Sequence, residues 1–260
     1  MTQDTPPHDK PNVALVTGAG RRLGRAIALG LAQAGWDVAV HYRHSEREAE
    51  DTAQAIRALG RRAALLACDL TDEAAVRALP GRAAEALGRV TCIVNNASLF
   101  EYDNATTFSP ALLSAHMSAN LAAPLLLAQA LHAATPENSQ AVVINLLDQK
   151  LYNLNPDFLS YTLSKAALDT ATKMLAQALA PTVRIVGVAP GITMVSGDQS
   201  EEGFKQAHTV TPLGRSSTPQ DIADAVVYAA SARALTGTTL VVDGGQHLVP
   251  LARDVMFLTK

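Results

Sequence analysis

Tyr161 and Lys165 lie four residues apart in a stretch whose apolar pattern predicts a helix over Leu159–Leu179. This spacing places both side chains on one face of the helix. An ammonium group beside a phenol favours the phenolate and lowers the pKa of the tyrosine, so Tyr161 becomes a usable proton donor or acceptor near neutral pH. Because such a pair also occurs by chance on exposed helices, the interpretation depends on its surroundings.

Two other polar or glycine-containing sequences end predicted strands elsewhere in the chain. Asn95-Asn96-Ala97 closes one apolar run, and Pro190-Gly191 closes another. In a doubly wound sheet, the carboxyl ends of the strands meet in the same crevice. We therefore expect Asn96, Ala97, Pro190 and Gly191 to lie near Tyr161 and Lys165.

A glycine-rich turn follows the first predicted strand, Val13–Thr17. It has glycines at 18, 20 and 24, but leucine at 23, where the common dinucleotide-binding pattern has its third glycine. Backbone N–H groups in such a turn can approach a pyrophosphate at a helix N-terminus. The alternative is an ordinary glycine-rich turn. The residues expected to bind a nucleotide here are Gly18, Gly20, Arg21, Arg22 and Leu23.

The end of the second predicted strand indicates which cofactor is used. An NAD-binding protein commonly has a carboxylate there for the ribose 2′-hydroxyl, but this chain has none before Glu46. Arginine, histidine and serine donors suit a 2′-phosphate, which predicts NADPH; a solvated basic helix start is the alternative. The expected contacts are Tyr42, Arg43, His44 and Ser45, with Asp69 and Leu70 after the third strand near the adenine. Asp69 could equally be a loop or cap residue.

Short β-branched runs alternate with alanine- and leucine-rich helical patterns along the chain. The predicted strands are Val13–Thr17, Asp37–Tyr42, Ala63–Cys68, Val90–Asn95, Ala141–Leu146, Val183–Val188 and Thr238–Val242. The predicted helices are Leu23–Ala34, Glu46–Leu59, Asp72–Leu87, Pro110–Ala134, Leu159–Leu179 and Pro219–Ser231. Apolar strands with little alternation are typical of a sheet covered by helices on both faces. The pattern predicts α/β architecture: one Rossmann-type doubly wound domain with seven parallel strands over residues 12–260.

Several boundary and loop signals accompany these elements. Gly35 and Gly60 fall just after predicted helices, and Asp72 and Thr218 are expected N-caps. The irregular stretch over residues 193–211 is expected to be a lid. The polar start, residues 1–11, is expected to be a disordered tail.

Composition excludes several classes of protein. The chain has 260 residues, 48% hydrophobic and 17% charged, with a net charge of −3, which argues against binding to nucleic acid or a membrane surface. We expect no apolar run to reach the ~18 residues of a membrane span. The start has no signal-peptide pattern, so a cytoplasmic protein is expected. Cys68 and Cys92 lie in apolar runs and are expected to be buried thiols, and no metal site is predicted.

Over residues 12–247 the sequence resembles the short-chain dehydrogenases/reductases. The resemblance rests on Thr17-Gly18 with Gly24, Asn95-Asn96-Ala97, Asn120, Tyr161 with Lys165, Pro190-Gly191 and Asp243-Gly244-Gly245. It implies a nicotinamide cofactor, Tyr161 as the proton donor, Lys165 as the ligand of the nicotinamide ribose, and Asn120 as the holder of a water that relays protons. It also implies a homotetramer, and the apolar end after Gln246 is expected to pack on a neighbouring subunit.

Two positions depart from the common pattern of this family and are similar to its pteridine reductase branch, which includes bacterial dihydromonapterin reductases. Arg22 stands where most members have glycine, and Asp148 stands where most have a catalytic serine. The resemblance also implies that Ser98 contacts the cofactor and that Phe100 stacks on a pterin.

An aspartate can accept hydrogen bonds from a pterin's amino and ring N–H groups, or pass on a proton when protonated, whereas a serine suits a carbonyl oxygen. The sequence therefore predicts an NADPH-dependent pterin reductase whose substrate contacts are Arg22, Ser98, Phe100, Asp148 and Tyr161. A carbonyl reductase of the same fold is the first alternative, and a catalytically silent NADPH-binding regulator is the second. Asp148 could also be a capping residue, and Phe100 a core aromatic.

Overall fold

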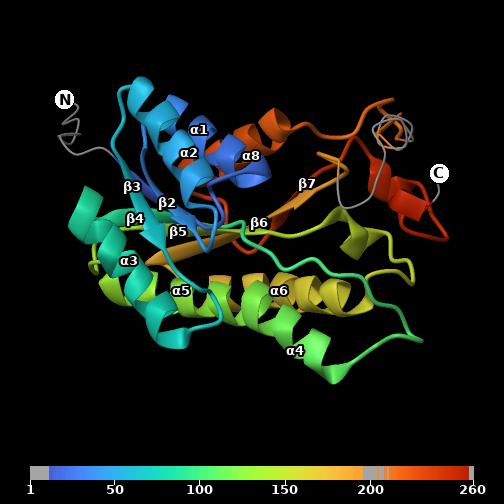
Figure 1. Ribbon diagram of the computed structural model, residues 1–260. Coiled ribbons are helices and arrows are strands. Elements are labelled where there is room, and N and C mark those ends of the chain that lie inside the picture. The colour runs from blue at the N-terminus through green and yellow to red at the C-terminus, as the bar shows by residue number, and fades with distance from the viewer. Residues whose placement is uncertain (1–11, 196–203, 205–207, 210, 258–260) are drawn as a thin grey trace.

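The computed structural model describes residues 12–195, 204, 208–209 and 211–257 (Figure 1). The expected tail over residues 1–11 and most of the expected lid over residues 193–211 lie outside the described residues. The described part contains a seven-stranded parallel sheet with the strand order β3-β2-β1-β4-β5-β6-β7. The fold is thus the doubly wound α/β arrangement that the sequence predicts.

Each strand lies within two residues of its predicted bounds. The strands are β1 Val13–Val16, β2 Asp37–Tyr42, β3 Ala63–Ala67, β4 Val90–Asn95, β5 Ala141–Leu146, β6 Val183–Pro190 and β7 Thr239–Val242. Every residue of β1 and β5 is buried, which explains why these strands are apolar throughout instead of alternating. Strand order reverses at β1, whose two neighbours are β2 and β4, and this reversal opens a crevice at the carboxyl ends.

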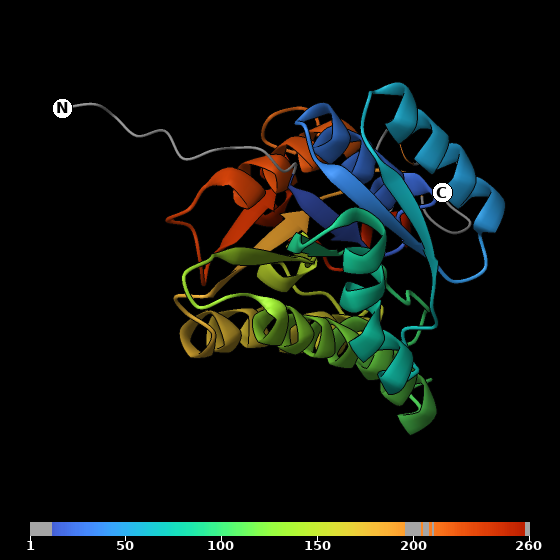
Figure 2. The ribbon, with the colours of Figure 1, turned by 90° about the vertical axis from the view of Figure 1, so that its left-hand side faces the viewer.

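Helices cover both faces of the sheet (Figures 1 and 2). They are α1 Arg22–Gln33, α2 Glu46–Ala58, α3 Glu73–Leu87, α4 Pro110–Met117, α5 Ala123–Ala134, α6 Leu159–Ala178 and α8 Pro219–Ser231. Ala14 and Val16 of β1 pack in a core with α1, α2 and α8, whereas Val13 and Leu15 pack in another core with α3, α5 and α6. Alternate residues of one strand thus pack against the helices on opposite faces of the sheet.

The residues predicted to bound helices do so, as N-cap side chains or as glycines after the last turn. Asp72 accepts a hydrogen bond from the backbone N–H of Ala75, and Thr218 forms a reciprocal capping box with Asp221. Gly35 and Gly60 have φ angles of 92° and 76°, in the left-handed region that glycine tolerates best after a helix. Cys68 and Cys92 are buried free thiols, as expected.

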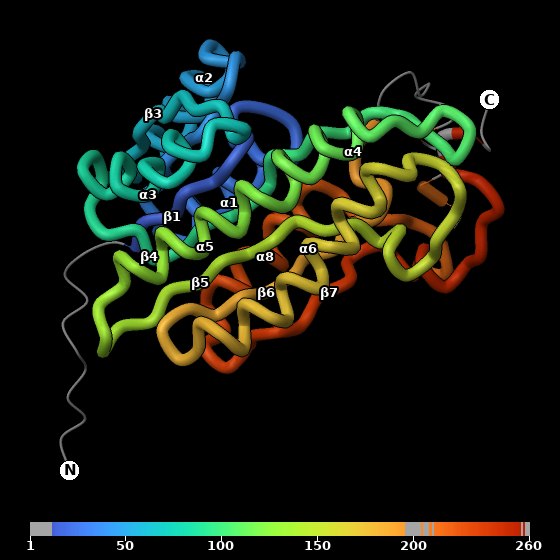
Figure 3. The backbone as a smooth tube through the Cα atoms, turned by 90° about the horizontal axis from the view of Figure 1, so that it is seen from below, coloured from blue at the N-terminus to red at the C-terminus, as the bar shows by residue number. Residues whose placement is uncertain are grey.

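The predicted helix over Pro110–Ala134 is wrong as a single regular element. It consists of α4, a π-helical turn η1 at Ser118–Ala122, and α5. The stretch is 25 residues long and contains an 18-residue window with a mean hydropathy of 1.4, so by length and composition it could cross a membrane, contrary to the expectation that no run is long enough. Leu127 and Leu131 of this stretch are buried in the core, and α5 packs on α3 while α4 packs on α6 (Figure 3). Apolar residues of this stretch are therefore used for packing within the described fold.

The chain after β7 forms two short 3-10 helices, η3 Gln246–Leu248 and η4 Val255–Phe257. That this apolar end packs on a neighbouring subunit stays a prediction. The ring of Phe257 lies 6.2 Å from that of Phe158 and 5.4 Å from that of Tyr102, so it finds aromatic partners in its own chain. Leu248 is exposed.

Candidate active site

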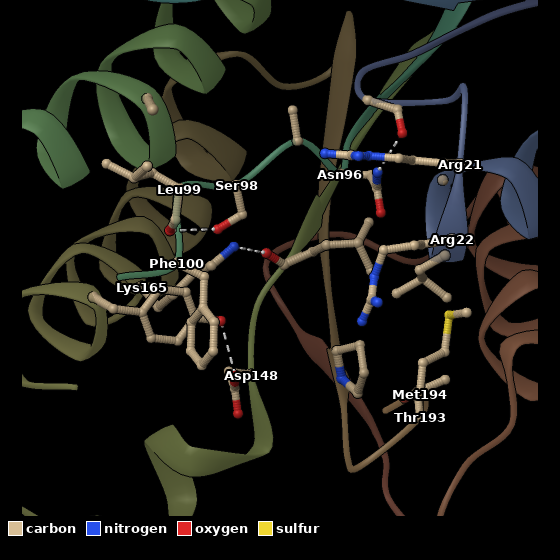
Figure 4. Close-up of a pocket in the computed structure, with 18 of the residues that line it drawn as sticks. Arg21, Arg22, Asn96, Ser98, Leu99, Phe100, Asp148, Lys165, Thr193 and Met194 are labelled. Carbon is tan, nitrogen blue, oxygen red and sulfur yellow. Dashed lines mark hydrogen bonds between the residues drawn. The ribbon is translucent and has the colours of Figure 1, made fainter. Parts of the chain in front are cut away.

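A cleft with a volume of about 1070 Å³ follows the carboxyl ends of the strands. Figure 4 shows Phe100, Lys165 and Asp148 at one side of this cleft, with Arg21 and Asn96 at the other. Every site residue predicted from the sequence lines the cleft except Gly20 and Asn120. Those residues come from six strand ends and from α6, so the fold brings together segments that are far apart in the sequence.

The glycine turn after β1 needs its glycines for two different reasons. Gly18 has a φ of 63°, and a Cβ on Gly24 would lie 2.1 Å from the carbonyl oxygen of Gly18. Gly20 faces away from the cleft: a Cβ there would lie 3.1 Å from the backbone nitrogen of Ala49 in α2. The expected nucleotide contact therefore fits Gly18, whereas Gly20 allows α2 to approach the turn.

His41 fixes this turn from β2. Its Nδ1 accepts a hydrogen bond from the backbone N–H of Gly18 at 3.0 Å, and its Nε2 lies 3.1 Å from the carbonyl oxygen of Cys68. Burial lowers the pKa of His41 to about 4, so the ring is neutral and Nε2 is the donor. This contact of His41 with the glycine turn was not predicted from the sequence, where a histidine at the end of an apolar strand was the available signal.

Arg22 has a backbone conformation that most residues avoid. Its φ is 52°, in the left-handed region, which costs a non-glycine residue about 1–2 kcal/mol. Arg22 lies in the cleft (Figure 4). Its guanidinium donates to the carbonyl oxygen of Val195 at 2.7 Å. Strained positions of this kind cluster at functional sites. The strain also explains why glycine is common at this position in the family that the sequence resembles.

The end of β2 presents its basic residues to the cleft. Tyr42, Arg43, His44 and Ser45 all line it. Arg43 forms an ion pair with Asp69 at 2.8 Å, and the two side chains are 57% and 38% exposed. Asp69 also accepts from the backbone and the hydroxyl of Thr71, so it is a turn-forming residue as well as a cleft residue. Asp69 can therefore be a loop residue and still face the place where the adenine is expected.

Thr17 and Asn96 join the first turn to the end of β4. The hydroxyl oxygen of Thr17 accepts from the backbone N–H groups of Asn96 and Ala97 at 2.9 and 3.0 Å. The side-chain amide of Asn96 donates to the carbonyl oxygens of Thr17 and Gly18 at 2.9 and 3.3 Å. Asn96 therefore shapes the nucleotide turn through its side chain.

Asn120 lies behind the cleft. Its amide oxygen accepts from Leu99 N–H and the Ser98 hydroxyl, at 2.8 and 3.2 Å. Its amide nitrogen donates to the Leu99 carbonyl and to the Ser164 hydroxyl, both at 3.0 Å. These four contacts use the ordinary capacity of an amide side chain. The Asn120 side chain positions Ser98 and Leu99 at the cleft wall, and the implied water relay at Asn120 stays a prediction.

Tyr161, Asp148 and Lys165 meet at the substrate end of the cleft. The Tyr161 hydroxyl donates to Oδ2 of Asp148 at 2.8 Å. Oδ1 of Asp148 accepts from the backbone N–H of Lys150 at 2.8 Å, so Asp148 is also the cap of the 3-10 helix η2, Gln149–Tyr152. The Nζ of Lys165 donates to the carbonyl oxygen of Leu146 at 2.7 Å (Figure 4). Asp148 thus caps η2 and bonds to the candidate proton donor at once.

The electrostatics of this group differ from the expectation that Lys165 lowers the pKa of Tyr161. Burial, and then the charge and hydrogen bond of Asp148, raise the pKa of Tyr161 well above its ordinary value. Burial lowers the pKa of Lys165 to about 8, and burial raises the pKa of Asp148. The expectation fails because the ammonium group bonds to a backbone carbonyl while the phenol bonds to a carboxyl group.

The start of α6, which carries Tyr161 and Lys165, is held by Asp103. Phe158, the N-cap of α6, has a φ of 55° and provides no side-chain cap. Asp103 instead accepts from the backbone N–H of Ser160 at 2.9 Å and from the Ser160 hydroxyl, and its carbonyl accepts from Leu159. Sequence reasoning missed Asp103, since nothing in the stretch after β4 distinguishes it.

Phe100 lies between the cleft and an aromatic cluster. Its ring stacks on that of Phe158 with 4.3 Å between centroids, and meets the edge of Tyr161 at 4.7 Å. It is nevertheless 40% exposed and lines the cleft. At the opposite side, a Cβ on Gly191 would lie 2.5 Å from the hydroxyl oxygen of Ser216, so Pro190-Gly191 needs its glycine for close packing.

Comparison with known proteins identifies related folds and sequences. The family described as enoyl-(acyl carrier protein) reductase matches residues 18–247. An uncharacterised oxidoreductase of Mycobacterium tuberculosis is 38% identical, over 90% of this chain and 91% of its own. The 3-oxoacyl-[acyl-carrier-protein] reductase FabG of Staphylococcus aureus is 31% identical, over 90% and 98%.

A solved structure is similar over nearly the whole chain. It is FolM alternative dihydrofolate reductase 1 from Brucella canis, in complex with NADP. Its sequence is 39% identical, the TM-score is 0.86, and the match covers 92% of this chain and 95% of that one.

Proposed function

Because the chain belongs to the short-chain dehydrogenase/reductase family of NAD(P)-dependent oxidoreductases, we propose that it uses NADPH to reduce a pterin or dihydropterin. The observation that carries the proposal is the contact between Asp148 and Tyr161, 2.8 Å at the substrate end of the cleft. A carboxyl group there suits a substrate edge that carries N–H donors. Phe100 offers an apolar face beside it for a flat ring system.

Several features of the cleft fit NADPH. Gly18 and Gly24 of the turn after β1 line the cleft at the N-terminal end of α1, where backbone N–H groups can approach a pyrophosphate. Arg43 shares an exposed ion pair with Asp69, and exposed pairs are worth only about 0–1 kcal/mol, so a 2′-phosphate can replace this partner. The Brucella relative was solved with NADP. The residues proposed to hold the cofactor are Gly18, Arg21, Arg22, Leu23, Tyr42, Arg43, His44, Ser45, Asp69, Leu70, Asn96, Ala97, Ser98, Lys165, Pro190 and Gly191.

In the proposed reaction, NADPH supplies a hydride when it is bound. Reduction of a ring C=N bond also needs a proton on the nitrogen, and the Tyr161 hydroxyl holds one at the substrate end of the cleft. Asp148 keeps this hydroxyl oriented, and its buried carboxyl group binds protons more readily than an exposed aspartate. Lys165 places a positive charge in the same wall of the cleft, where ribose hydroxyls are expected.

A carbonyl reductase is the second candidate, and the similarity to the Staphylococcus aureus 3-oxoacyl reductase favours it. Such an enzyme needs a neutral donor to the substrate oxygen, and a buried carboxyl that has lost its proton opposes a developing alkoxide. Tyr161 and Lys165 fit both candidates, whereas Asp148 favours the pterin.

The test compares the wild type with Asp148→Ser. The kcat/KM for a dihydropterin and for an activated ketone is measured with NADPH from about pH 5 to about pH 8. We expect the substitution to lower pterin reduction and to leave the Kd of NADPH nearly unchanged. A wild type that reduces no pterin, or a serine variant with an increased ketone rate, would contradict the proposal.

A further inference from the structure

The cleft beyond Tyr161 is closed by residues from near the end of the chain. Asp254 and Val255 line this part of the cleft together with Asp148 and Lys150. Asp254 and Lys150 are 104 positions apart in sequence, yet Nζ of the lysine lies 3.1 Å from Oδ2 of the aspartate. The segment Arg253–Phe257, here called the C-terminal segment, lies beside the loop between β5 and α6 (Figures 1 and 3).

The C-terminal segment is held firmly in this position. The guanidinium of Arg253 makes a forked contact with Asp157, with N···O distances of 2.7 to 3.0 Å. The backbone N–H of Asp254 donates to the same carboxylate at 2.7 Å. Asp157 is only 2% exposed, and Phe257 stacks on the neighbouring Phe158. Charge-assisted bonds to a buried carboxylate therefore fix the backbone at Asp254.

The ion pair between Lys150 and Asp254 presents its negative partner to the cleft. The Lys150 side chain is 4% exposed and its ammonium lies 5.3 Å from the centre of the Phe158 ring, whereas Asp254 is 19% exposed. A buried ion pair is a weak source of stability, because desolvation offsets its attraction. Its effect here is to hold a carboxylate at the substrate end, where a carboxylate can accept from several donors at once.

The charge of Asp254 acts on the reacting groups. It contributes to the raised pKa of Asp148 and of Tyr161, after the larger effect of burial. Two carboxyl groups at one end of a cleft favour a ligand edge rich in hydrogen donors. A plain ketone brings acceptors alone and gains nothing from the second carboxylate.

We propose that the C-terminal segment is a substrate-binding wall of the active site, in which Asp254 is a specificity residue that accepts hydrogen bonds from amino or ring N–H groups of a nitrogen heterocycle. The inference rests on the pterin function proposed above and extends it to a part of the chain outside the resemblance that ends near residue 247. Lys150 and Arg253 are positioning residues in this arrangement.

The first experiment compares Asp254→Asn with Asp224→Asn, a matched change on the exposed face of α8. Asparagine keeps the shape and still accepts from Lys150, but it replaces the charged acceptor. We expect Asp254→Asn to raise the KM for a dihydropterin about 10-fold, the loss of one charge-assisted hydrogen bond, with kcat changed much less. The ketone KM and the NADPH Kd should stay unchanged, and Asp224→Asn should match the wild type throughout.

Two further variants separate substrate contact from folding. Asp254→Glu retains the charge and should recover part of the pterin KM. Arg253→Gln leaves Asp254 in place but loosens its anchor, and it should raise the pterin KM while the NADPH Kd stays constant.

The outcomes distinguish this inference from the function on which it rests. A wild type that reduces pterins, with Asp254→Asn unchanged in pterin KM, overturns the role of Asp254 and leaves the proposed function standing. A fall in Tm and in NADPH binding for Asp254→Asn, or an equal loss on ketone and pterin, shows a structural role and also overturns it. A wild type that reduces no pterin overturns both.

Discussion

The hydroxyl of Tyr161 donates to Oδ2 of Asp148 at 2.8 Å, so the candidate proton donor and the aspartate at the usual serine position form one hydrogen-bonded pair. Burial raises the pKa values of both groups, and the negative charge of Asp148 raises that of Tyr161 further. Two acids this close titrate together, so the apparent pKa values in a pH–rate profile describe the pair and cannot be assigned to one residue.

Removal of the phenol should stop proton transfer without disturbing the fold. We expect Tyr161→Phe to lower kcat by about 10²-fold or more, the usual range for loss of a general acid. The Kd of NADPH, measured by fluorescence titration, should change little, since phenylalanine keeps the packing against Phe100. More than half of the wild-type activity in this variant would show that the proton comes from another group.

Cofactor choice should depend on Arg43 at the end of β2. The wild type is expected to prefer NADPH over NADH by about 10-fold or more in kcat/KM, from at least one charge-assisted contact with the 2′-phosphate. Arg43→Asp places a carboxylate beside Asp69 and should erode this preference. Equal kcat/KM values for both cofactors in the wild type would contradict the proposal that the end of β2 binds the 2′-phosphate.

The buried His41 should make the fold sensitive to acid. Its pKa is about 4 in the fold and about 6.5 when unfolded, so between these values the unfolded chain binds more protons and stability falls as pH falls. The contribution is fully present above about pH 6.5, and about 2 kcal/mol of it is lost by pH 5. Urea denaturation at several pH values measures this loss.

His41→Gln is the informative variant for this measurement, because glutamine can still accept from Gly18 and donate to Cys68 without titrating. It should have a flatter dependence of unfolding free energy on pH. His132→Gln, a change at an exposed histidine, is the matched control and should behave as the wild type. If the unfolding free energy of His41→Gln depends on pH as that of the wild type does, groups other than His41 cause the sensitivity to acid.

The apolar face of α6 should bury itself in an oligomer. Leu163 and Met174 are 46% and 65% exposed, and their spacing of about three turns puts them on one face. We expect a homotetramer by light scattering after gel filtration, and Leu163→Glu should dissociate it. Leu59→Glu, at a similarly exposed leucine beyond α2, should leave it intact. A monomeric wild type would contradict this prediction.

Strand positions and the residues at their ends were predictable from the sequence for a physical reason. A strand covered on both faces must be apolar throughout, and glycine or asparagine marks where it leaves the sheet. Since parallel strands share one carboxyl edge, Asn96 and Gly191 had to converge on the cleft. The spacing of Tyr161 and Lys165 placed them on one face of α6, whereas their mutual orientation depended on partners outside the helix.

Features made by distant partners were not predictable. The apolar pattern continues through Ser118–Ala122, so nothing in it marks the π-helical turn around Asn120. The anchor of α6 joins Asp103 to Ser160 across 57 positions, and the pair of Lys150 with Asp254 spans 104. Such contacts have no periodicity, because tertiary packing alone brings their residues together.

The separate origins of the two sides of the cleft have a consequence for recombination. The side proposed for the cofactor is built from residues between 18 and 98, from Lys165 and from the end of β6. The far side is lined by Phe100 and Tyr161, by the start of the loop from Asp148 to Phe158, and by the C-terminal segment. Exchanging the loop and the C-terminal segment between relatives should therefore change the substrate preference and leave the cofactor-binding side unaltered. They must be exchanged as a matched set, because Arg253 without Asp157 would leave the graft unanchored.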